Sequence, residues 1–252
     1  MNKQQAIFDL ALWMGDNTLI LGHRLSELCG HGPILEQDIA LTNIALDLVG
    51  QSRMWLSLAG EVEGKDRTED DFAYYRGERD FTNVKLVEMP NHHWGYVIAR
   101  QFIYDAHHLA ILEQLVDSSD QAIADIAAKA IKEVQYHLRF SSEWMIRMGD
   151  GTAVSHEKAQ TSLEDLAPYI KSLTLTDEIS TFAAAEGIGF DAGRVEQEAW
   201  ATMQKVLEEA TLKLEPSEYY HKGGKQGLHT EHMGFILAEM QSVVRAMPGN
   251  TW

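Results

Sequence analysis

Long segments with helical periodicity are the feature that most constrains this fold. Apolar residues recur at a spacing of three to four over stretches of about 25 residues, and the five prolines mostly lie between those stretches. No Asn-Gly or Asp-Gly turn separates alternating apolar runs, so strand signals are nearly absent. The sequence therefore predicts an all-α protein.

The helices expected from this periodicity are joined by short connectors. They cover about residues 3–28, 35–59, 70–79, 91–116, 121–148, 155–169, 174–185, 191–214 and 230–246. Asn91 is the expected N-cap of the fourth helix, and Pro168 is expected to break the sixth. Residues 81–90 are expected to be a linker and residues 215–227 a loop. The pattern contains a weak repeat of helix pairs and no boundary between two cores, so we expect one domain over residues 1–252.

Composition limits the classes of function. The chain has 252 residues, is 45% hydrophobic and carries a formal net charge of −17. The hydrophobic content is enough for a sizeable core, and the negative charge argues against nucleic acid or anionic membrane as partners. Cys29 is the single cysteine, which excludes a disulfide framework and fits a reducing, cytoplasmic setting. No apolar run is long enough for a membrane span.

Acidic residues recur inside the expected long helices. In the stretch 131–144, Glu133 and His137 share a stripe with Phe140 and Trp144. Burying such groups is costly unless they are paired or bind a metal. Three more of the expected helices carry an acid on or beside an apolar face: Asp16, Asp47 and Asp105. The two acids of the first helix pair are 31 residues apart, and Asp105 and Glu133 of the second pair are 28 residues apart. This arrangement is typical of a ferritin-like bundle.

The ligand set for two metals is nevertheless incomplete. In a di-iron bundle, two helices supply Glu-x-x-His, but here Gly50 and Tyr136 occupy the imidazole positions. His137 comes one residue after the position that the imidazole of a Glu-x-x-His motif would take. His108 lies on a helix that, in this template, supplies an acid and no histidine. One interpretation is a working di-iron centre with unusual ligands. The favoured alternative is a metal-free core in which old ligand positions pair, such as Asp105 with His137 or Glu133 with His108.

Two features near the C-terminus also invite a chemical interpretation. His229-Thr-Glu-His232 resembles a metal motif, but capping of the last helix explains its polar residues equally well. Lys222-Gly-Gly-Lys225 combines glycines with ammonium groups before a helix, which could hold phosphate. It lacks the spacing of a P-loop, so a solvated loop is the favoured interpretation.

Several segments together resemble one known family. These are Gly15–Asn17, Ile44–Gln51, Lys129–Glu133 with Tyr136–Phe140, and above all Gly223–His232 followed by Leu237–Gln241. They closely resemble the C subunit of the bacterial 1,2-phenylacetyl-CoA epoxidases, multicomponent ring-epoxidising monooxygenases of phenylacetate degradation. The resemblance runs from Asp16 to Trp252 and is most specific in the C-terminal motif.

The resemblance implies a ferritin-like helical bundle with additional C-terminal helices and a non-catalytic, structural role. The di-iron centre would belong to the homologous catalytic A subunit, and flavin and iron–sulfur cofactors to a reductase subunit of the oxygen- and NADPH-dependent complex. No catalytic residue, metal or cofactor is expected in this chain. Its partners would be the catalytic A subunit, other members of the complex and, as a further option, a second copy of itself. Lys222 and Lys225 are weak candidates for contact with the CoA phosphates.

Two other functions stay open from the residues. One is a free-standing carboxylate di-iron oxidase that uses the atypical ligand set. The other is a helical scaffold protein with an unrelated partner.

Overall fold

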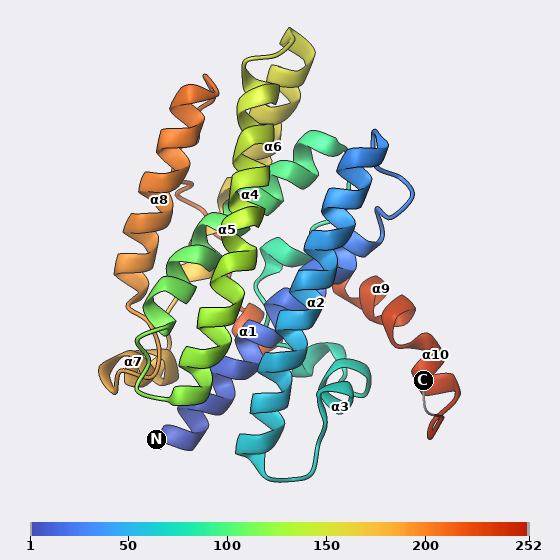
Figure 1. The fold of residues 1–252 in the computed structure, drawn as a ribbon, viewed down its shortest axis with the longest axis vertical. Coiled ribbons are helices and arrows are strands. Elements are labelled where there is room, and N and C mark those ends of the chain that lie inside the picture. Colours follow the sequence, from blue (N-terminus) through green and yellow to red (C-terminus); the bar gives the residue numbers. More distant parts are fainter. Residues whose placement is uncertain (1, 251–252) are drawn as a thin grey trace. The chain divides into compact units, whose positions relative to one another are not determined.

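The computed structural model describes residues 2–250, which form helices and connectors with no strand in this range (Figure 1). Trp252, where the resemblance ends, lies outside the described residues. The all-α prediction is confirmed, and the architecture is consistent with a ferritin-like bundle with additional C-terminal helices. The helices are α1 (Lys3–Ser26), α2 (Leu35–Glu63), α3 (Glu69–Tyr74), α4 (Trp94–Leu115), α5 (Gln121–Gly149), α6 (Ala153–Ile170), α7 (Glu178–Ala185), α8 (Ala192–Glu209), α9 (Glu231–Met240) and α10 (Ser242–Ala246).

Three details of the helices differ from expectation. His93, not Asn91, caps α4 by accepting a hydrogen bond from the amide of Tyr96, while Asn91 accepts one from Arg100. Pro168 lies inside α6 and does not break it: the ring removes one backbone donor, and the buried Leu166 and Ile170 on either side keep this turn packed in the core. The last helix divides at Gln241 into α9 and α10.

The chain folds into two compact units. Of the described residues, the first contains 2–90 and 222–250, and its main feature is the packing of α1 against α2. These two helices run antiparallel (Figure 1), as their short connection predicts. Their shared core is apolar and buried, and includes Leu21, Leu25, Leu48 and Trp55. The connector after α3 and the C-terminal helices α9 and α10 complete this unit.

The second unit contains residues 91–221. Its main feature is the pair α4 and α5, and α6 and α8 pack against α4. The side chain of Asp120 caps α5 by accepting from the amide of Ile123. Each unit therefore holds one of the two helix pairs that form the weak repeat in the sequence. The expected joining of both pairs into one domain stays a prediction.

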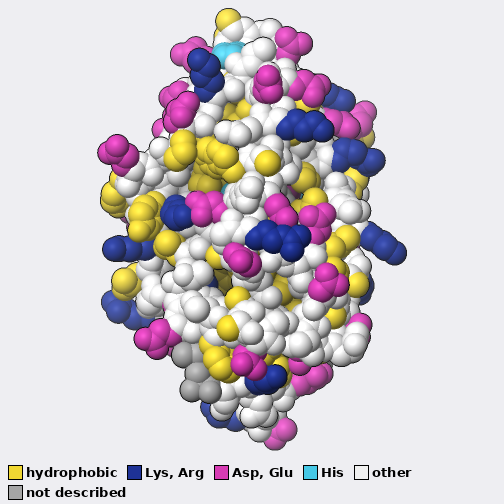
Figure 2. Space-filling view, turned by 90° about the vertical axis from the view of Figure 1, so that its left-hand side faces the viewer, with side chains coloured by type: hydrophobic (Ala, Val, Ile, Leu, Met, Phe, Trp, Pro, Cys, Tyr) yellow, Lys and Arg dark blue, Asp and Glu magenta, His cyan; other side chains and the backbone are white. Residues whose placement is uncertain are grey.

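The surface mixes charges of both signs. On the face drawn in Figure 2, acidic side chains are interspersed with basic and hydrophobic ones. Among the described residues, no helix is both long enough and apolar enough to cross a membrane.

Candidate functional site

The acid of α1, Asp16, is fully buried and is held by an arginine. Both of its carboxylate oxygens accept hydrogen bonds from the guanidinium of Arg76. Oδ2 also accepts from the amide of Thr82 at 2.8 Å and from its hydroxyl at 3.0 Å. The carboxylate is therefore satisfied by groups from the connector that follows α3, not by imidazoles.

Arg76 is itself fixed on every side. Only 6% of it is exposed, and it also donates to the carbonyl oxygens of Phe72 and Asp80. Its guanidinium lies 4.1 Å from the ring centroid of Phe81, a favourable cation–π distance. No periodic signal marks this residue in the sequence, because it lies between two short helices.

The second helix pair contains a separate polar cluster. Asp105 on α4 is fully buried, and its carboxylate oxygens accept from Gln101 Nε2 at 2.6 Å and Ser141 Oγ at 2.8 Å. Burial raises the pKa of Asp105 to about 7, although the nearby charge of His137 and the two hydrogen bonds oppose this rise. Asp105 and His137 thus interact, as expected, whereas Glu133 on α5 is only half-buried.

His108 does not form the pair suggested by the sequence. Its ring is buried 5.0 Å from the ring of Tyr104, and within residues 2–250 neither ring nitrogen has a hydrogen-bond partner. It therefore makes no hydrogen bond with Glu133. Burial lowers the pKa of His108 to about 3, with the charge of His137 as a second cause, so this imidazole is neutral.

These residues do not fit a di-iron centre. Iron needs several hard ligands at once, whereas Asp16 is already ion-paired with Arg76 and Asp105 is hydrogen-bonded by Gln101 and Ser141. Asp47 is half-buried, while Gly50 is exposed and Tyr136 is 39% exposed. Across residues 2–250, His, Cys, Asp and Glu side chains form no group of three that could hold a metal ion.

We expect Asp105→Asn to flatten the pH dependence of stability. A carboxyl whose pKa is raised in the folded state destabilises that state as pH rises from the unfolded pKa toward the folded one. The loss of unfolding free energy between about pH 5 and pH 8 should shrink by on the order of 2 kcal/mol. Urea denaturation at both pH values measures it. The exposed Asp125→Asn in α5 is the control, and an identical pH profile for both variants would contradict the burial of charge at Asp105.

Another buried carboxylate with four hydrogen bonds lies in residues 81–90, the expected linker. Glu88 is fully buried and accepts four hydrogen bonds: from Asn83 Nδ2 at 2.9 Å, from His229 at 2.6 Å, and from the amide and hydroxyl of Thr230, both at 2.7 Å. Sequence reasoning missed it, although an acid between Leu86-Val87 and Met89 is a signal of a buried carboxylate. Glu88 thereby joins the connector to the start of α9.

His229 is a structural cation. Its Nδ1 contacts the Glu88 carboxylate, and its Nε2 contacts the carbonyl oxygen of Phe81 at 2.9 Å. Both partners are acceptors, so both nitrogens donate and the ring is protonated. Burial lowers the pKa of His229, but the hydrogen bond and charge of Glu88 outweigh it and raise the pKa above its usual value. With both nitrogens engaged, this histidine offers no metal ligand.

The glycine loop before α9 is shaped by close packing. A Cβ on Gly224 would collide with the carbonyl oxygen of Asn83, and one on Gly227 with that of Arg79. Gly227 also has a φ of +70°, which favours glycine. Lys225 Nζ lies 4.9 Å from the ring centroid of Trp13, and Lys222 is exposed. Packing explains the glycines, and contact of these lysines with CoA phosphates stays a prediction.

Comparison with known proteins identifies the family. The model of the family described as "Phenylacetic acid catabolic protein" matches residues 1–252. The chain is 48% identical over 242 residues, 96% of its length and 97% of the relative's, to the C subunit of the "1,2-phenylacetyl-CoA epoxidase" of Escherichia coli (strain K12). The chain belongs to the family of phenylacetic acid catabolic proteins. The resemblance found in the sequence is therefore confirmed.

The C-terminal motif that carries the resemblance has a structural explanation. Gly224 and Gly227 allow close packing, and His229 and Thr230 bind Glu88. The motif therefore fastens the C-terminal helices within the first unit.

Proposed function

We propose that the chain is a non-catalytic assembly subunit of a phenylacetyl-CoA epoxidase, and that it supports a catalytic subunit which carries the di-iron centre. A reductase subunit with flavin and iron–sulfur groups would deliver electrons. The observation that carries the proposal is the match over nearly the whole length of the C subunit of the Escherichia coli enzyme. The ion pair of Asp16 with Arg76 and the hydrogen bonds from Gln101 and Ser141 to Asp105 support the non-catalytic role.

An exposed stripe along α2 supports a role in assembly. Its apolar members recur at helical spacing and remain open to solvent: Leu35 (71% exposed), Ile39 (51%), Leu46 (65%) and Val49 (37%). Exposed Gly50 lies beside them, and a Cβ placed on it would meet nothing within 4 Å, so another backbone can approach closely there. Such a stripe fits a helix of the catalytic subunit.

We expect Leu46→Asp to abolish co-elution with the catalytic subunit. A carboxylate at the centre of the stripe would be desolvated in the complex, and binding should weaken at least about 100-fold. Val154→Asp on α6 is the matched control, because Val154 is also exposed (62%) and does not belong to the stripe. Size-exclusion chromatography of the mixed subunits measures the effect. Equal co-elution of both variants would exclude the stripe as the contact.

Iron loading separates the alternatives. The purified chain, reconstituted anaerobically with ferrous iron, should retain no stoichiometric metal and consume no oxygen by itself. About two bound irons with oxygen reduction would favour the free-standing oxidase. Failure to bind the catalytic subunit, with capture of an unrelated protein, would favour the scaffold.

A further inference from the structure

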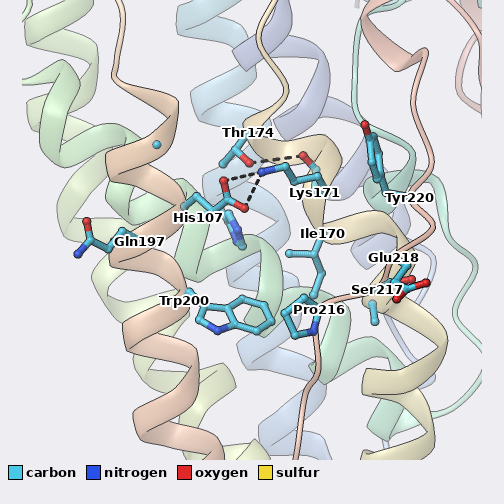
Figure 3. A pocket seen from close by; sticks show the side chains of 13 residues that line it. His107, Ile170, Lys171, Thr174, Gln197, Trp200, Pro216, Ser217, Glu218 and Tyr220 are labelled. Carbon is cyan, nitrogen blue, oxygen red and sulfur yellow. Dashed lines mark hydrogen bonds and ion pairs between the residues drawn. The ribbon is translucent and has the colours of Figure 1, made fainter.

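A cavity of about 600 Å³ opens within the second unit. Its walls come from the end of α6, from α8 and from the connector before the glycine loop, and one residue of α4 lies at its base (Figure 3). This volume lies within the range of small-molecule sites in proteins. The lining residues that matter here are His107, Ile170, Lys171, Glu196, Trp200 and Pro216.

His107 gives this cavity a buried hydrogen-bond acceptor. Only 1% of the residue is exposed, and Nδ1 lies 2.8 Å from the carbonyl oxygen of Ile103. Because a carbonyl can only accept, Nδ1 carries the proton. Burial lowers the pKa of His107 to about 4, so the ring is neutral and Nε2 keeps its lone pair. No group in residues 2–250 donates to Nε2, and the ring lines the cavity.

The remaining walls favour an uncharged ring. Trp200, Pro216 and Ile170 face the same space and supply a flat, apolar surface (Figure 3). Lys171 forms an ion pair with Glu196, with Nζ to carboxylate distances of 2.7 and 2.6 Å. Each charge of this pair compensates the other, and Glu218, the remaining charged residue of the lining, disfavours an anion.

We propose that this cavity binds a neutral ring compound with one O–H or N–H donor, whose ring packs on Trp200 and whose donor bonds to Nε2 of His107. The cavity shares no residue with the Asp105 cluster or with the α2 stripe. The inference therefore stands independently of the proposed assembly role.

Phenol and anisole test the proposal, because they share a ring and differ in the hydroxyl donor. Titration by isothermal calorimetry should give about tenfold tighter binding of phenol, the effect of one hydrogen bond to a buried acceptor. In protein labelled with ¹⁵N-histidine, phenol should shift the Nε2 resonance of His107, and anisole should shift it much less. This second measurement needs no variant, so it decides even if substitutions at His107 prevent folding.

Substitutions show which residues cause the difference in affinity between phenol and anisole. His107→Phe should bind phenol and anisole equally, and Trp200→Ala should weaken both. His156→Phe is the matched control, because His156 Nδ1 also bonds a backbone carbonyl, that of Gly149, and the residue does not line the cavity. The proposal is overturned if wild-type protein binds both compounds equally, if it binds neither at millimolar concentration, or if another histidine gives the shift.

Discussion

Arg76→Ala should lower the free energy of unfolding by about 3–5 kcal/mol, because it leaves the buried carboxylate of Asp16 without its counter-charge. The variant also removes donors to two backbone carbonyls and the contact with Phe81. The hydroxyl and amide of Thr82 remain, but they bring no positive charge. Chemical denaturation at neutral pH measures the loss.

An exposed ion pair supplies the control. Arg53 binds Glu69 at 3.0 Å, but the arginine side chain is 76% exposed, so Arg53→Ala should cost less than about 1 kcal/mol. A double-mutant cycle with Asp16→Leu and Arg76→Met isolates the pair: the double variant should be more stable than the sum of the single losses implies. If Arg76→Ala costs no more than Arg53→Ala, Asp16 is not held as described.

Glu88→Ala should have an effect of similar size, about 3–5 kcal/mol, because it strands a charged His229 and three other donors in the interior. The lost contacts join the connector to α9, so the C-terminal segment should also loosen. We expect trypsin to cleave after Lys222 and Lys225 faster than in the wild type. Glu239→Ala, at an exposed position of the same helix, should change neither stability nor cleavage.

The Glu88–His229 pair also determines whether stability rises or falls with pH. The pKa of His229 is raised in the folded state. Its contribution to the free energy of unfolding is therefore complete below the unfolded-state pKa and is lost as pH rises through the folded-state pKa. The melting temperature of the wild type should therefore fall as pH rises above about 6.5, the usual pKa of histidine, and His229→Gln should reduce this slope. A slope that is unchanged in His229→Gln would contradict a charged His229.

The helices were predictable because their information is local. Apolar periodicity and side-chain caps such as Asp120 and Thr230 lie within a few residues of the elements that they define. The same reasoning singled out Asp16 and Asp105 as acids inside helices, and both are fully buried.

The partners of Asp16 and Glu88 were not predictable, because Arg76 and His229 come from segments without periodicity. Arg76 lies 60 residues from Asp16 in sequence, and His229 lies 141 residues from Glu88. The ligand pattern of di-iron bundles also singled out positions such as Tyr136, which is exposed. Spacing along a helix predicts which side chains share a face, but it does not predict which connector supplies a counter-charge.

The first unit is assembled from both ends of the chain, with residues 91–221 between its parts, and this has a consequence for its synthesis. Glu88 leaves the ribosome long before His229, and at about 5–20 residues per second the interval is roughly 7–28 s. During that interval the second unit, residues 91–221, is synthesised, and the carboxylate has no imidazolium to pair with. We therefore expect nascent chains that end before residue 222 to leave the first unit open to proteases and chaperones.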